Sequence, residues 1–191
     1  MFLEEAFGMN LEEWYNRGMT AQDYVDQMQS HQTDFIYIYE NFSVSIEDQP
    51  LFEQLQNKKL RAIVLTEDWC GDAMLNLPIF LRIAEASHIP THFLLRDENE
   101  ELMNQYLTNG SKSIPKLIFI NSEGKEVGTW GPRAPQIQEF IEESFAQLPD
   151  KSAEDFQEKR KEMLTFVTKA YRDNQDIWHA VYHDFKKTMK Q

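Results

Sequence analysis

Thr66-Glu67-Asp68-Trp69-Cys70-Gly71-Asp72-Ala73 is the stretch that decides the fold, because it joins a short apolar run to a longer helical one. The run before it, residues 62–65, reads Ala-Ile-Val-Leu, which is typical of a buried strand. The run after it, residues 74–86, has the length and apolar content of a helix. Cys70 is the only cysteine in the chain. The sequence therefore predicts a strand that delivers a Trp-Cys-Gly turn onto the N-terminus of a helix.

The composition of the whole chain is that of a globular protein with a sizeable core. Of its 191 residues, 41% are hydrophobic and 13% are aromatic, which suits one domain with added segments. No apolar run approaches the roughly 20 residues that span a bilayer, and the first residues lack the features of a signal peptide. A single cysteine excludes an internal disulfide. We therefore expect a cytoplasmic protein.

The charge is strongly negative and unevenly distributed. A net charge of −13 argues against nucleic acid or an anionic membrane as a partner, because both require clustered Lys and Arg. Residues 1–57 carry −10, residues 58–149 carry −4 and residues 150–191 carry +1. Two interpretations follow. The acidic groups form a solvated surface, or the near-neutral C-terminal tail docks on the acidic N-terminal segment.

The first third of the chain predicts short helices. Asn10-Leu11-Glu12-Glu13 has the form of a capping box, and Gly18 stands where that helix would end. Thr20 opens a second helix. Apolar positions across residues 35–42 follow helical spacing, although residues 35–39 also fit a strand. Asp48 is placed to cap a fourth helix.

From Leu60 onward the pattern changes to strands that alternate with helices. Asn121-Ser122-Glu123-Gly124 has the form of a hairpin turn between two strands. Pro78 is expected to kink the helix that follows Cys70, because it removes one backbone donor. The predicted elements cover residues 61–65, 74–86, 92–95, 98–107, 116–120, 125–129 and 135–147.

The last 40 residues predict a helical tail. Ser152-Ala153-Glu154-Asp155 has the form of a second capping box. Apolar residues from Met163 to Phe185 follow helical spacing, and residues 173–176 interrupt it, which leaves one long helix or two. This apolar face must be covered, either by the chain's own body and N-terminal helices or by a separate partner.

The chain resembles the thioredoxin family at positions spread over residues 58–148. The matching landmarks are Trp69-Cys70-Gly71, Pro78, Ser113-Ile114-Pro115, Gly124 and Gly131. The whole chain is similar to a bacterial single-cysteine subfamily that shares Glu67–Asp72, Ser113–Pro115 and Trp130–Arg133. The resemblance implies an α/β thioredoxin fold with a central mixed sheet over residues 58–148. A helical extension would cover residues 1–57, and a helical tail would cover residues 149–191.

The position of Cys70 at a helix N-terminus bears on its reactivity. Free backbone N–H groups and the positive end of the helix dipole favour the thiolate by about 1 kcal/mol. Glu67, Asp68 and Asp72 oppose a further negative charge, but exposed carboxylates act weakly through solvent and salt. We therefore predict a moderately activated thiol.

The resemblance also implies the remaining site residues. The peptide bond into Pro115 would be cis, and the backbone of Ile114 would pair with a bound substrate chain beside Cys70. Trp69 and Gly71 would flank the thiol. Arg133 would approach the same surface and bind the carboxylates of a small thiol, with a solvated arginine as the alternative.

Two departures from the family limit the chemistry. Ala73 replaces the second cysteine, and Val64 stands where thioredoxins usually keep a buried Asp that manages protons. Cys70 is therefore predicted to work by monothiol exchange with thiol- or disulfide-bearing proteins or small thiols. No resident cofactor is expected, and a low-molecular-weight thiol would act as the recycling reductant. The alternative function is a redox-inactive binding module that uses the groove near Pro115 and the apolar face of the tail.

His179 and His183 are spaced i, i+4, which is also the spacing of two metal ligands on a helix. No third ligand completes a known pattern, and favourable charge near a helix C-terminus explains the pair more simply. The sequence predicts no metal site.

Overall fold

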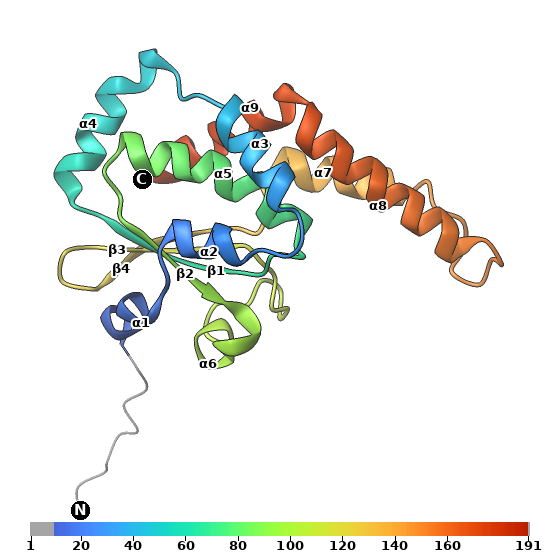
Figure 1. Cartoon of the computed structure of the whole chain (residues 1–191), viewed down its shortest axis with the longest axis horizontal. Helices are drawn as coiled ribbons and strands as arrows, with labels where there is room; N and C mark the ends of the chain where they lie inside the picture. The colour runs from blue at the N-terminus through green and yellow to red at the C-terminus, as the bar shows by residue number, and fades with distance from the viewer. Residues whose placement is uncertain (1–9, 191) are drawn as a thin grey trace, which may run out of the picture.

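The fold is built on a four-stranded mixed sheet. The computed structural model describes residues 10–190 (Figure 1). The strand order is β2-β1-β3-β4, with β1 parallel to β2 and antiparallel to β3, and β3 antiparallel to β4. The strands are β1 (Arg61–Thr66), β2 (Thr91–Leu95), β3 (Lys116–Ile120) and β4 (Glu126–Trp130). The predicted α/β fold with a mixed sheet is thereby confirmed.

The two central strands are buried almost throughout, as their nearly continuous apolar sequences predict. Val64 of β1 is opposite Phe93 of β2 and Leu117 of β3, and all three side chains are fully buried. Helix α5 (Gly71–Ala86) follows β1 and is also largely buried, which explains why its sequence is apolar on most sides. It continues through Pro78 as a single helix.

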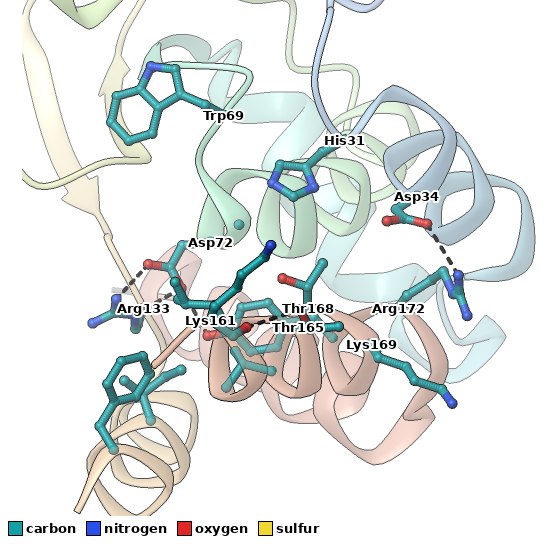
Figure 2. Close-up of a pocket in the computed structure, with 16 residues that line it drawn as sticks. His31, Asp34, Trp69, Asp72, Arg133, Lys161, Thr165, Thr168, Lys169 and Arg172 are labelled. Atoms are coloured by element: carbon teal, nitrogen blue, oxygen red, sulfur yellow. Dashed lines mark hydrogen bonds and ion pairs between the residues drawn. The ribbon is translucent and has the colours of Figure 1, made fainter. Parts of the chain in front are cut away.

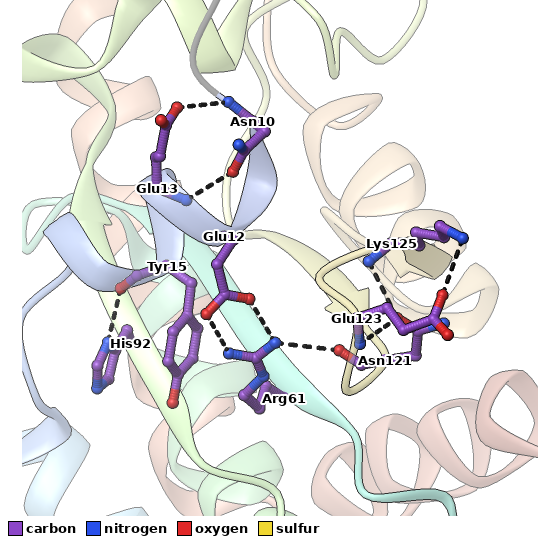
Figure 3. Close-up of polar contacts among 9 residues, drawn as sticks. All are labelled: Asn10, Glu12, Glu13, Tyr15, Arg61, His92, Asn121, Glu123 and Lys125. Atoms are coloured by element: carbon purple, nitrogen blue, oxygen red, sulfur yellow. Dashed lines mark hydrogen bonds and ion pairs between the residues drawn. The ribbon is translucent and has the colours of Figure 1, made fainter.

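The N-terminal segment forms the predicted helices. They are α1 (Leu11–Arg17), α2 (Ala21–Gln27), α3 (Gln32–Asn41) and α4 (Gln49–Lys58). The capping box is present, because Asn10 and Glu13 exchange side-chain and backbone bonds of 2.9 Å each (Figure 3). Thr20 caps α2. Residues 35–39 lie inside α3, so the strand alternative is wrong.

Helix α1 is fixed to the sheet by several bonds (Figure 3). Arg61 of β1 donates to both carboxylate oxygens of Glu12. The ring of Tyr15 stacks on His92 with centroids 4.1 Å apart. Gly18 ends α1 with an ordinary φ of −69°, and a Cβ there would lie 2.7 Å from the Cβ of His92. A glycine is therefore required by close approach to β2 rather than by a left-handed turn.

Three local predictions were wrong: one helix is shorter than predicted, and two predicted caps are not formed. The helix predicted over residues 98–107 is only α6 (Glu100–Met103), and the chain then enters turns that end in a bridge between Thr108 and Ser111. Asp48 does not cap α4, because its carboxylate accepts bonds from Tyr182 and Lys186. The box predicted at residues 152–155 is absent.

The tail forms two helices and packs on the rest of the chain. Its helices α8 (Phe156–Asp173) and α9 (Gln175–Met189) meet at Asn174, whose side chain caps α9. In Figure 1, α8 extends away from the sheet beside α7 (Pro135–Phe145). Ser152 bonds Asp150 instead of opening α8.

Helix α9 completes the core. The ring of Phe185 lies 4.0 Å from that of Trp130 and 5.5 Å from that of Phe80. The tail also docks on the acidic N-terminal segment, since Lys186 pairs with Asp48 at 2.6 Å. The apolar face of α9 is therefore covered by the chain itself, while Leu164 and Phe166 of α8 stay exposed. None of the helices within residues 10–190 is long and apolar enough to cross a membrane.

Candidate functional site

The structure brings Cys70 together with Ile114 and Pro115. Cys70 is the N-cap residue of α5, and the residue is 9% exposed. Its thiol donates to the carbonyl oxygen of Ile114, with 3.5 Å between sulfur and oxygen. The peptide bond between Ile114 and Pro115 is cis. The thiol therefore lies at the first turn of a helix and against the loop that precedes β3.

Gly131 makes room for this loop. Its φ is +114°, and a Cβ at that position would lie 2.1 Å from the carbonyl oxygen of Pro115. Lys116 is buried beside Gly131, and its amine donates to the carbonyl oxygen of Gly131 at 3.2 Å. The segment after β4 is thus packed directly on the Pro115 turn. This contact carries Arg133 to the start of α5.

Arg133 forms an ion pair with a carboxylate of the chain itself. Its Nε and Nη2 lie 2.9 Å and 2.7 Å from the two oxygens of Asp72, a bidentate ion pair (Figure 2). Tyr171 of α8 donates to Asp72 Oδ1 at 2.9 Å. Arg133 is therefore not simply solvated, and its binding of a carboxylate of a small thiol stays a prediction. Sequence reasoning missed Tyr171, whose aromatic ring fits the apolar pattern of the tail and gives no separate signal.

The moderately activated thiol predicted for Cys70 is wrong. Burial raises the pKa of Cys70 to about 11, and the charge of Asp72 acts in the same direction. The backbone N–H groups of Ala73 and Asp72, and then Arg133, lower this pKa but are outweighed. The prediction assumed exposed carboxylates. The side chain of Asp72 is only 12% exposed, so its charge acts on the thiol through little water.

The other two acidic residues of the motif bind backbone. Asp68 accepts from the N–H groups of Gln29 at 2.6 Å and Ser30 at 3.2 Å, which ties the connection between α2 and α3 to the Cys70 turn. Glu67 is buried and accepts from the N–H of Asp97 at 2.9 Å. Burial raises the pKa of Glu67. These carboxylates hold the loops around the thiol in place.

The two tryptophans near the site differ in role. Trp69 is 49% exposed beside Cys70, and the guanidinium of Arg96 lies 4.9 Å from its ring centre. Trp130 is buried, and its indole N–H donates to Asp184 at 2.7 Å. Gly71 faces open space, with no atom within 4 Å of a Cβ built there. The exposed surface next to the thiol is therefore formed by Trp69 and Gly71.

The two residues that depart from the thioredoxin pattern, Ala73 and Val64, are both buried. Ala73 is 1% exposed in the first turn of α5, and Val64 is fully buried in the centre of the sheet. Among residues 10–190, no group of three or more His, Cys, Asp or Glu side chains is arranged to hold a metal ion. The ring of His179 packs edge-on against Phe42.

A pocket of about 850 Å³ opens beside the Cys70 turn. Trp69, Gly71 and Asp72 form one edge of it, while α7 and α8 form a long wall (Figure 2). Cys70 itself is not among the residues that line it. The C-terminal tail therefore forms part of the surface next to the Cys70 turn.

Comparison with known proteins agrees with this geometry. The chain is similar over 95% of its length to an HIV epitope-scaffold protein, with a TM-score of 0.65, 17% identity and 98% of that chain covered. It is also similar to a protein of unknown function from Pseudomonas aeruginosa, with a TM-score of 0.60, 15% identity, and 92% of this chain and 99% of that chain covered. These likenesses show the fold alone.

No curated protein matches the chain. A family model described as thioredoxin matches residues 18–153, which is more than half of the chain and includes both Cys70 and Pro115. The chain belongs to the thioredoxin family.

Proposed function

We propose that the protein carries out thiol–disulfide exchange through Cys70 alone. The observation that carries this proposal is the position of the sulfur, 3.5 Å from the Ile114 carbonyl oxygen and beside Pro115, at the first turn of α5. The backbone N–H groups of Asp72 and Ala73 lower the pKa of the thiol and so favour its thiolate. The exposed ring of Trp69 provides a surface for the partner.

The proposed reaction conserves disulfide bonds. The Cys70 thiolate attacks one sulfur of a mixed disulfide, forms a new bond to it and expels the other thiol, which takes up a proton. Ala73 cannot supply a second thiol. A small thiol from outside therefore attacks the Cys70 adduct, becomes part of a new disulfide and restores the Cys70 thiol. This cycle requires a reducing compartment, for which we propose the cytoplasm.

A second candidate is a redox-inactive binding module of the same fold. The raised pKa of Cys70 favours it, because few thiolates exist at neutral pH. The α9 part of the tail's apolar face cannot serve as its binding surface, since Val181 and Phe185 are fully buried against the body. Such a module would bind its partner through the surface around Trp69 and Pro115.

A defined substrate distinguishes the two candidates. The full chain is incubated near pH 9 with a peptide that carries a mixed disulfide to a small thiol, and adducts are detected by intact mass. Exchange predicts an adduct at Cys70 that disappears when excess small thiol is added, and no adduct in Cys70→Ser. Failure of the folded wild-type chain to form an adduct over hours would exclude the exchange function and leave the binding module.

A gain-of-function variant tests the same proposal from the other side. Ala73→Cys supplies the missing second thiol at the position where thioredoxins keep theirs. If the rest of the site is intact, the variant gains reductase activity toward a protein disulfide. Because Ala73 is buried, folding of the variant is checked by circular dichroism before its activity is compared.

A further inference from the structure

The pocket beside the Cys70 turn is lined mainly by one face of α8. From that helix it receives residues spaced three, four, seven and eight apart, which is one stripe of a helix. Helix α7 supplies Ile141 and Phe145, and His31 and Asp34 close the side toward α3. The α8 stripe consists of Lys161, Leu164, Thr165, Val167, Thr168, Lys169, Tyr171 and Arg172.

The charge of this pocket is opposite to that of the whole protein. In a chain of net charge −13, the lining contains four Lys and Arg side chains and His31 but only two carboxylates. Both carboxylates are already paired, Asp72 with Arg133 and Asp34 with Arg172 at 3.6 Å (Figure 2). Among residues 10–190, no ion pair involves Lys161 or Lys169. Asp173, just outside the lining, also pairs with Arg172 at 2.7 Å and interacts electrostatically with Lys169, so the surplus of positive charge in the pocket is largest at Lys161.

The same pocket has an apolar lining that is partly open to solvent. Ile141 and Phe145 face it from α7, and Leu164, which is 40% exposed, faces it from α8. Val167 lies beside them and is buried. Exposed apolar side chains next to cationic ones recognise a ligand that has both an apolar body and an anionic head.

We propose that this pocket binds a small carboxylate that carries an apolar chain. The chain would lie on Ile141, Phe145 and Leu164, and the carboxylate would be attracted by the charges of Lys161 and Lys169, which stand about two helical turns apart on α8. Arg133 and Arg172 are already paired with carboxylates, so the two lysines supply the attraction. Binding here does not require the thiol, since Cys70 is not part of the lining.

Octanoate and octan-1-ol form a matched pair of probes, because they share a chain length and differ in charge. Binding of each to the full chain is measured by calorimetry at low ionic strength. We expect octanoate to bind at one saturable site about tenfold more tightly than octan-1-ol. Lys161→Gln/Lys169→Gln should weaken octanoate binding by about tenfold, because each exposed lysine contributes a modest charge interaction, and should leave octan-1-ol binding unchanged.

Two further variants control for net charge and for the thiol. Lys58→Gln/Lys125→Gln removes the same charge at exposed positions outside the pocket lining and should bind octanoate as the wild type does. Cys70→Ser should also bind it unchanged. Equal binding of octanoate and octan-1-ol, no binding of either, or equal losses in the two double variants would each overturn the proposal.

Discussion

At the scale of single residues, Cys70 occupies a position that both helps and hinders its ionisation. The helix N-terminus and the N–H groups of Asp72 and Ala73 favour the thiolate, while burial and the carboxylate of Asp72 oppose it. Burial and the charge of Asp72 outweigh the favourable groups, so the pKa of Cys70 is raised. A thiol with the geometry of a thioredoxin nucleophile is therefore kept protonated at neutral pH.

The pH dependence of alkylation tests this balance. Because the pKa of Cys70 is raised to about 11, the thiolate fraction keeps rising well beyond the pKa of a free cysteine. The rate of reaction with iodoacetamide should increase about tenfold per pH unit between about pH 7 and pH 10. Free cysteine, measured in parallel, should level off near about pH 9. A Cys70 rate that levels off below this control would contradict the raised pKa.

Asp72 provides a second test at the same scale. Asp72→Asn removes the negative charge nearest the thiol and leaves Arg133 free to favour the thiolate, so the pKa of Cys70 should fall. We expect alkylation near neutral pH to accelerate by about three- to tenfold. The ion pair with Arg133 is also lost, at a cost of about 1–3 kcal/mol in the free energy of unfolding.

Asp68→Asn is the matched control, because Asp68 belongs to the same motif but bonds the backbone of Gln29 and Ser30. Its alkylation rate should stay within about twofold of the wild type. An equal acceleration in both variants would show that loosening of the loop, rather than the charge of Asp72, controls the thiol.

At the scale of elements, α8 is joined to α5 through Tyr171. Its hydroxyl donates to Asp72 at 2.9 Å from a side chain that is 2% exposed. Tyr171→Phe keeps the ring and removes this one charge-assisted bond, so the free energy of unfolding should fall by about 1.5–3 kcal/mol in urea titrations.

The control for this variant removes a tyrosine hydroxyl at another position. Tyr106 donates to Glu126 at 2.6 Å, but this pair is exposed. Tyr106→Phe should cost less than about 1 kcal/mol. Similar losses in the two variants would mean that the bond to Asp72 contributes nothing beyond an ordinary surface contact.

The elements also show what the sequence could predict. The strands, α5 and the N-terminal helices followed from local signals: continuous apolar runs, a capping box at Asn10 and helical spacing over residues 35–42. The short α6 and the unused caps at Asp48 and Ser152 did not, because each depends on bonds that local patterns do not contain. Asp48, for example, bonds Tyr182 and Lys186 from the far end of the chain.

The candidate site divides in the same way. The positions of Cys70, Ile114 and Pro115 followed from spacing and resemblance, because these residues belong to short motifs. The state of the thiol did not, since it depends on whether Asp72 is exposed. The exposure of Asp72 is decided by Arg133 and by Tyr171, and Tyr171 lies 99 residues after Asp72 in the sequence.

At the scale of the whole molecule, the tail and the N-terminal segment share one core with the sheet. Buried side chains from all three parts form a single cluster, with Phe35 and Phe52 from the N-terminal segment, Phe80 and Trp130 from the body, and Phe185 from the tail. The uneven charge fits this arrangement, because the near-neutral tail lies against the acidic segment and places Lys186 on Asp48.

This shared core predicts that the tail cannot unfold separately. Phe185 is fully buried and stacks on Trp130, so Phe185→Ala should lower the free energy of unfolding by about 3–5 kcal/mol. Circular dichroism and tryptophan fluorescence should still report one coincident urea transition. Phe166→Ala removes the same ring from α8, where it is 55% exposed, and should cost less than about 1 kcal/mol. Separate transitions, with the body stable while α9 unfolds, would show that the tail is an attached element rather than part of the core.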